Sequence, residues 1–185
     1  SNGRYPLATP RLRGISDLLA YLYGSENFVF KFFECPEKVD ALCGQLTDFW
    51  IQFARTQLNH IPLFEGGIGS FYYHMWAPAG TVWLQEDSAA LLSPDLFRRH
   101  ILPCVERQIG AFNGCIMHMH PTGYYPYREY LKTGMLALEL HIDEGGPSAQ
   151  ELVSVHREIL AEKPLVIWGY ISDEDMDWIF TQLPP

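Results

Sequence analysis

The stretch "NGCIMHMHPTGYYPY", residues 113–127, joins an apolar run to two histidines and then breaks at a proline and a glycine. Residues 115–120 are rich in large apolar side chains, which predicts a buried β-strand. Side chains two positions apart on a strand lie on the same face, so we expect His118 and His120 to share one face at its carboxyl end. Cys115 lies an odd number of positions before both histidines, and we expect it on the opposite face, in the core.

Strand, loop and helix alternate on both sides of this stretch. Apolar or β-prone runs predict further strands at 61–64, 81–84, 135–143 and 164–171. Apolar residues at helical spacing predict helices over 36–58, 94–109, 127–132, 152–160 and 173–183. Ser93 and Ser172 are the expected N-caps of two of these helices, and Pro103 is expected to kink one of them. Five strands alternating with helices indicate an α/β fold with a parallel sheet.

Length, composition and charge narrow the functional class. The 185 residues, 48% of them hydrophobic, suffice for one core, so we expect a single domain over 14–185. Residues 1–13 form its lead-in, and the first three resemble a tag remnant. The net charge of −9 and the lack of a basic cluster argue against nucleic acid as a partner. No run approaches the roughly 20 apolar residues of a membrane span, and no signal peptide is recognisable, so a cytoplasmic protein that does not enter a membrane is expected.

Polar side chains gather where the predicted strands end. These are Glu65, Gln85 to Asp87, His118 and His120, Glu139 with His141 and Asp143, and Trp168. The carboxyl ends of parallel strands form the ligand site of α/β folds, so we expect one shared site. Imidazole and carboxylate are good ligands for zinc and similar divalent ions, which predicts a metal site. The alternative is that each histidine is a hydrogen-bonded core or rim residue.

Other polar motifs are weaker candidates. The glycine-rich segment 66–69 lacks the spacing and the downstream acid of a dinucleotide fingerprint. Residues 70–76, "SFYYHMW", predict a packed loop or pocket wall, with His74 as a pocket residue. His100 and His156 lie in helical patterns, and we expect both on the surface.

Four segments occur in an informative order: "ENFVFKFFECPEKVDALCGQLTDFWIQF", "DSAALLSPDLFRRHILPCVERQI", "CIMHMH" and "YLKTGMLALELHID". This order resembles the uroporphyrinogen decarboxylase superfamily, which includes zinc-dependent methyltransferases that act on corrinoid proteins. The corresponding family features are a helix with a "PE" start, a "LLSPelFrefvlP" segment, a strand ending in His-x-Cys, and "leetGvdalslD". The resemblance spans roughly residues 14–169.

The resemblance implies a (β/α)8 TIM barrel, of which this chain would be the central and later part. His118 falls on the zinc-ligand histidine of the methyltransferase branch and His120 on its cysteine, while Asp87 falls on the polar start of the "SPelF" segment. The third ligand of that branch is a later cysteine, which has no counterpart before Pro185. Imidazole in place of thiolate makes zinc less suited to activating a thiol.

The first functional interpretation is therefore a metal-dependent methyltransferase that moves a methyl group between a small molecule and a corrinoid protein. His118 and His120 would bind the zinc or similar ion, and Glu139, His141 or Asp87 would be the third ligand or proton-transfer group. Alternatives are a tetrapyrrole enzyme like the decarboxylase itself, a non-enzymatic small-molecule-binding module, and an amidohydrolase-type metal hydrolase. Uncovered strand edges of a partial barrel would favour homo-oligomers.

Overall fold

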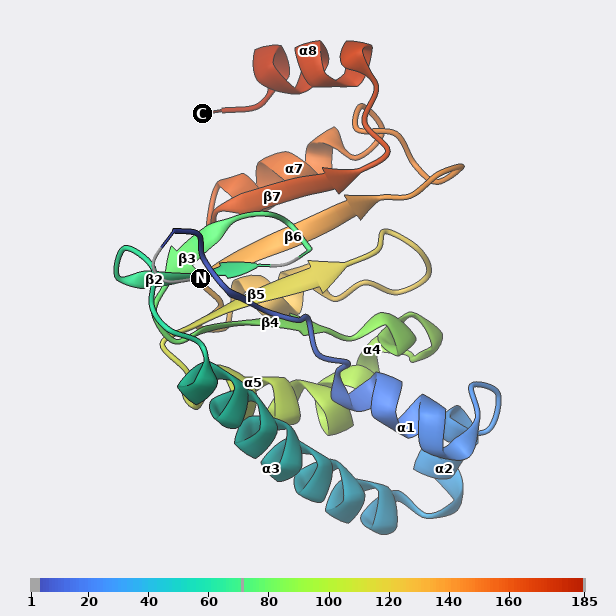
Figure 1. Cartoon of the computed structure of the whole chain (residues 1–185). Coiled ribbons are helices and arrows are strands. Elements are labelled where there is room, and N and C mark those ends of the chain that lie inside the picture. The colour runs from blue at the N-terminus through green and yellow to red at the C-terminus, as the bar shows by residue number, and fades with distance from the viewer. Residues whose placement is uncertain (1–3, 71, 185) are drawn as a thin grey trace.

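A four-stranded parallel sheet forms the centre of the molecule (Figure 1). The computed structural model describes residues 4–70 and 72–184. The strands are β4 (Thr81–Gln85), β5 (Gly114–Met119), β6 (Ala137–Ile142) and β7 (Leu165–Gly169). They lie side by side in chain order, and each pair is parallel. The α/β prediction is confirmed, and the strands of the described residues do not close into a barrel.

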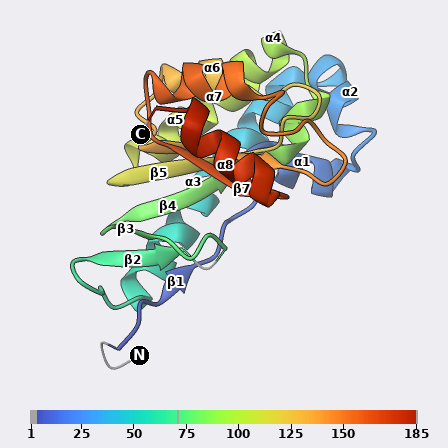
Figure 2. The ribbon, with the colours of Figure 1, turned by 90° about the horizontal axis from the view of Figure 1, so that it is seen from above.

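Helices connect successive strands and cover one face of this sheet (Figure 2). The connections hold η1 (Asp87–Leu91), α4 (Pro94–Leu96), η2 (Phe97–Ile101), α5 (Leu102–Gly110), α6 (Tyr127–Leu131) and α7 (Val153–Leu160), and α8 (Asp173–Gln182) follows β7. The side chains of Ser93 and Ser172 accept bonds from the backbone N–H groups of Leu96 and Asp175, which confirms both N-caps. The helix that contains Pro103 is interrupted by the π-helical turn η2, because proline has no N–H to donate to the preceding turn.

The first part of the chain adds a helical layer beside α5. It consists of β1 (Ala8–Thr9), α1 (Ile15–Tyr23), α2 (Phe28–Glu34) and α3 (Pro36–His60). Pro36 occupies the first position of α3, where its missing N–H is not needed. The Trp50 indole N–H donates to the backbone carbonyl of Arg13 at 3.0 Å, which ties α3 to the segment that enters α1.

The prediction of a strand at 61–64 is wrong. The α3 helix continues to His60, and Glu65 and Gly66 have φ of 51° and 74°, so the chain turns within a few residues. The turn leads into a hairpin of β2 (Gly67–Ser70) and β3 (Trp76–Pro78), and β1 pairs with β2. This three-stranded small sheet covers the face of the parallel sheet opposite the helices.

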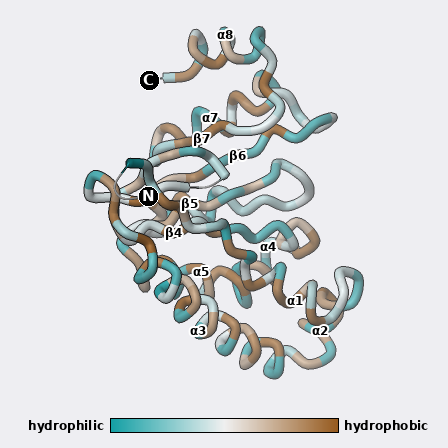
Figure 3. Tube along the Cα trace, in the orientation of Figure 1, coloured by the Kyte–Doolittle hydropathy of each residue, from teal (hydrophilic) through white to brown (hydrophobic). Residues whose placement is uncertain are grey.

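The side chains of the parallel sheet alternate between two apolar clusters. Val82 and Leu84 pack towards the helices, whereas Trp83 packs against Ile68 of the small sheet. Cys115 is buried in the helix-side cluster, as predicted. The loops after β5 and β6 are hydrophilic, in contrast to the strands that precede them (Figure 3). Within the described ranges no helix has both the length and the apolar character needed to cross a membrane.

His100 and His156 were expected on the surface, and both expectations are wrong. His100 is 4% exposed, and His156 is fully buried. Each belongs to an apolar stripe: His100 lies three residues after Phe97, and His156 lies four residues after Leu152. His100 bonds Asp40 at 2.5 Å, whereas neither ring nitrogen of His156 has a partner among the described residues. Residues 1–3, the predicted tag remnant, lie outside the described residues.

Candidate metal centre

The strand register places the predicted site residues in adjacent rows on one face of the sheet. His118 on β5 lies beside Gln85 on β4 and Glu139 on β6. One step further along, His141 on β6 lies beside Trp168 on β7. This is the face that carries Trp83, towards the small sheet, because these positions have the same parity along their strands. The carboxyl ends of the strands thus gather the residues that the sequence singled out.

His118 occupies the centre of the cluster. It is 2% exposed, and its Nδ1 contacts the fully buried carboxylate of Glu139. Its Nε2 lies 2.8 Å from Nε2 of His120. His120 in turn points its Nδ1 at Asp143, 2.8 and 2.9 Å from the two carboxylate oxygens. Each imidazole therefore has a carboxylate at its Nδ1, the nitrogen that points away from the other ring.

This arrangement fixes which nitrogens are free. An ionised carboxylate only accepts hydrogen bonds, so each Nδ1 carries a proton and each neutral ring has its lone pair on Nε2. Burial lowers the pKa of His118, which favours the neutral ring. Two lone pairs 2.8 Å apart repel each other unless a proton or a cation lies between them. A carboxylate on the far nitrogen of each histidine is the usual support of metal-bound imidazole.

Asp87 is the third group beside His118 and His120. Ligand atoms of Asp87, His118 and His120 all lie within 4.8 Å of one another. The Asp87 Oδ2 atom accepts bonds from Arg13 at 3.2 Å and from Gln85 at 2.8 Å, while its buried Oδ1 has no partner among the described residues. Two imidazoles and one carboxylate form a donor set that suits zinc. Nitrogen ligands of a tetrahedral zinc ion lie about 3.3 Å apart, so the rings would separate by roughly half an ångström.

Glu139 and His141 lie on the other side of the His118 ring. Burial by itself raises the pKa of Glu139, but the hydrogen bond from His118 and the nearby His141 ring outweigh it and lower the pKa below the usual value. The His141 Nδ1 lies 3.4 Å from Glu139 Oε1, and both atoms are buried without a hydrogen-bond partner among the described residues. His118, Glu139 and His141 form a second group with metal-ligand spacing. Glu139 faces Nδ1 of His118, whereas His120 faces its Nε2. The two metal-ligand groups therefore share the His118 ring and lie on opposite sides of it.

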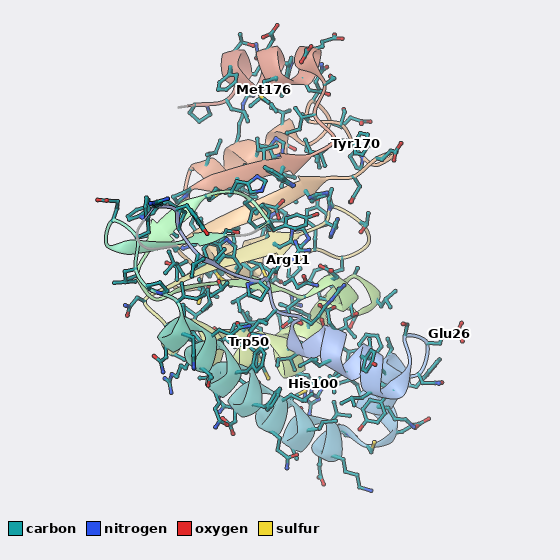
Figure 4. The ribbon with its side chains drawn as sticks, viewed as in Figure 1. Arg11, Glu26, Trp50, His100, Tyr170 and Met176 are labelled. Atoms are coloured by element: carbon teal, nitrogen blue, oxygen red, sulfur yellow. The ribbon has the colours of Figure 1, made fainter. Side chains whose placement is uncertain are left out.

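Tyr73 is a site residue that was not singled out from the sequence. It follows β2, and its hydroxyl donates to Glu139 Oε2 at 3.1 Å and lies 3.0 Å from His118 Nδ1. Arg11 donates to the same hydroxyl at 3.0 Å, and its guanidinium lies 4.7 Å from the centre of the Tyr72 ring. In Figure 4 Arg11 lies over the strands of the parallel sheet. The aromatic segment 70–76 predicted a pocket wall, but no sequence signal pointed to Arg11.

The remaining candidates divide between the rim and other roles. The His74 ring lies 6.3 Å from that of Trp168, at the edge of the site, and Phe71 of the same segment lies outside the described residues. Glu65 lies in the turn before β2, and among the described residues no hydrogen bond or ion pair joins it to the site. Glu86 faces the helix side, where it accepts bonds from the backbone N–H groups of Ile15 and Ser16 at 2.8 and 2.7 Å.

Comparisons of this chain with protein-family models and with curated proteins find no match. The functional conclusion therefore rests on the geometry of the cluster and on the chemistry of its side chains.

Proposed function

We propose that this protein is a metal-dependent enzyme of the methyltransferase type, which moves a methyl group between a small molecule and a corrinoid protein. One observation carries the proposal: two carboxylate-supported imidazoles present their Nε2 atoms to each other at 2.8 Å. His118, His120 and Asp87 would hold zinc or a similar divalent ion, and Glu139 and Asp143 would orient the two rings. The bound ion would act as a Lewis acid that polarises the heteroatom of the substrate.

The fold is compatible with the superfamily that the motif order resembles. Four parallel strands in chain order, with helices on one face and polar residues at their carboxyl ends, match a segment of a (β/α)8 barrel. We therefore propose that the sheet is a barrel segment and that the chain is related to the uroporphyrinogen decarboxylase superfamily. In such a barrel the face that carries His118 would point inwards.

Side chains of this protein would supply the proton that the reaction consumes. The corrinoid would accept the methyl group, and the heteroatom that loses it would keep the bonding electrons and need a proton. His141 would supply that proton, because its side chain is 14% exposed and its ring centre lies 4.9 Å from that of the proposed ligand His120. Glu139 Oε1, 3.4 Å from Nδ1 of His141, would orient this ring.

The test is methylation of free cob(I)alamin by methanol and methylamines, with zinc-loaded protein and absorbance as the readout. We expect zinc-dependent formation of methylcobalamin, and a loss of at least about 100-fold in His120→Ala. His60→Ala is the matched control, because His60 is exposed at the end of α3 and its ring bonds the backbone carbonyl of Thr56 in its own helix. Equal rates in wild type and His120→Ala, or no zinc-dependent methylation with any donor, would contradict the proposal.

A further inference from the structure

The Glu139 carboxylate has two imidazole rings within reach. Its Oε2 atom contacts Nδ1 of His118, whereas its Oε1 atom lies 3.4 Å from Nδ1 of His141 and accepts no hydrogen bond from the described residues. Rotation about the last side-chain bond of a glutamate is soft, so the carboxylate could exchange its closer contact between the two rings. A further group must therefore fix its orientation.

Tyr73 binds one oxygen of this carboxylate selectively. Its hydroxyl donates to Oε2 of Glu139 at 3.1 Å, the same oxygen that contacts His118. Tyr73 is 4% exposed, and its ring packs edge-on against Trp168 with the ring centres 5.8 Å apart, so the hydroxyl is held in place. Because this donor bonds Oε2 and leaves Oε1 without one, the closer contact of the carboxylate stays on His118.

Arg11 determines where the single proton of the Tyr73 hydroxyl points. A tyrosine hydroxyl donates one hydrogen bond, and His118 Nδ1 lies 3.0 Å from this oxygen as a second possible acceptor. A guanidinium only donates, and Arg11 donates to the Tyr73 oxygen at 3.0 Å, so the hydroxyl proton must point elsewhere. An ionised carboxylate is a stronger acceptor than a neutral ring nitrogen, so the proton goes to Glu139.

The position of Arg11 is itself fixed. Its side chain is half-buried, and its guanidinium lies 4.7 Å from the centre of the Tyr72 ring, over the strands of the parallel sheet (Figure 4). The segment that carries it is tied to α3 by the bond from the Trp50 indole to the Arg13 carbonyl at 3.0 Å. The lead-in before α1 therefore holds the guanidinium in a defined place beside the site.

We propose that Arg11 and Tyr73 are positioning residues of the metal centre, which keep the Glu139 carboxylate on Nδ1 of His118 and so leave Nε2 of that ring to the ion. The inference deepens the proposed function, on which the role of Nε2 in metal binding rests. The hydrogen bonds involve protein groups only, so they set the tautomer of His118 before an ion binds. Arg11 and Tyr73 are not among the ligand groups, and both act through Glu139.

Nitrogen-15 NMR of histidine-labelled, metal-free protein at neutral pH tests the inference, because long-range proton correlations show which ring nitrogen carries the proton. The His118 signal is the one that His118→Ala removes. We expect a proton on Nδ1 alone in wild type, and a second form protonated at Nε2 in Tyr73→Phe and in Arg11→Met. Tyr170→Phe and Arg99→Met are the matched controls, because both side chains are exposed and among the described residues no hydrogen bond joins them to the site.

Zinc affinity, measured by chelator competition, gives a second readout. We expect Tyr73→Phe to lower it about 10-fold, at the low end of the effect of groups that support a metal-bound histidine. Arg11→Lys keeps a charged donor and should lower it less than Arg11→Met. Tyr73→Phe keeps the ring against Trp168, and thermal unfolding verifies that each variant is folded.

His118 protonated only at Nδ1 in both Tyr73→Phe and Arg11→Met would overturn the inference. Its failure differs from that of the proposed function, because the NMR signal needs no ion. A changed tautomer in a protein that binds no zinc would support the positioning role and refute the metal-dependent function. Zinc binding with an affinity and a His118 tautomer that both variants leave unchanged would refute the positioning role alone.

Discussion

The two nitrogens of His118 have different neighbours and therefore different roles. Nδ1 faces Glu139, a carboxylate with no exposed surface, and Nε2 faces His120. Glu139 thus acts on a metal ion only through the orientation and protonation of the ring. A substitution that keeps its size but removes its charge should weaken this support without opening a cavity.

We expect Glu139→Gln to lower zinc affinity about 10- to 100-fold, the usual effect of losing the carboxylate behind a metal-bound histidine. Competition with a chromophoric chelator measures this affinity. Glu162→Gln, at an exposed position after α7, is the control and should leave it unchanged. Unchanged affinity in Glu139→Gln would show that the carboxylate does not support a metal ligand.

His156 makes the stability of the protein depend on pH. Burial lowers its pKa to about 4, below the usual value of 6.5. Between these values the unfolded chain binds a proton that the folded chain does not, so stability is complete above pH 6.5 and falls as the pH approaches 4. The loss attributable to this residue is about 2 to 3 kcal/mol.

We expect His156→Leu to reduce this acid-induced loss, because leucine fills the buried site without a titratable group. Urea unfolding at pH 7.5 and at pH 4.5 gives the two free energies for each protein. His60→Leu, at an exposed position, should retain the wild-type difference. An undiminished loss in His156→Leu would mean that other groups cause the acid sensitivity.

The α1 helix is fastened to the end of β4 by Glu86 and Gly14. Glu86 accepts three hydrogen bonds from Ile15 and Ser16, at 2.6 to 2.8 Å. A Cβ atom at Gly14 would collide with the backbone oxygen of Gln85 and the Glu86 side chain. Gly14 therefore allows the helix to approach the end of β4, two residues before the proposed ligand Asp87.

Gly14→Ala should force α1 away from β4 and destabilise the fold by about 1 to 3 kcal/mol, the usual cost of overpacking. Urea unfolding measures the change. Gly110→Ala is the matched control, because nothing lies within 4 Å of a Cβ there and alanine favours the helix. A Gly14→Ala protein as stable as wild type would show that the helix can shift without cost.

The elements differ in how far sequence predicts them. The four parallel strands were predictable because each is an apolar run of strand length, and β4, β5 and β6 are buried on both faces. The small sheet was not, because β1 and β3 have two and three residues and glycine forms half of β2. Such short strands are specified by tertiary pairing rather than by local pattern.

The same distinction applies to the site as a whole. His118, His120, Glu139, His141 and Asp87 were identified from their positions at strand ends, and the structure brings them together. Which nitrogen faces which acid depends on register and ring orientation, so the sequence left the roles of Glu139 and Asp87 open. Tyr73 and Arg11 reach the site from the small sheet and the lead-in, whose placement the local pattern does not encode.

Exposed apolar side chains lie on several outer helices. Tyr21, Phe33 and Phe180 are 88%, 70% and 79% exposed, and β7 has no second neighbour among the described strands. Tyr170 at the end of β7 and Met176 on α8 are also exposed (Figure 4). Self-association stays a prediction. Sedimentation velocity should show a dimer or larger species, and a monomer at all concentrations would contradict it.

The metal content of the purified protein tests the central claim most directly. We predict about one equivalent of zinc or a similar divalent ion per chain after zinc loading and desalting, measured by elemental analysis, and none in the His118→Ala/His120→Ala double variant. The His60→Ala protein should retain the metal. Wild-type protein that binds no metal under these conditions, or a double variant that binds as much as wild type, would contradict the claim that His118 and His120 form a metal centre.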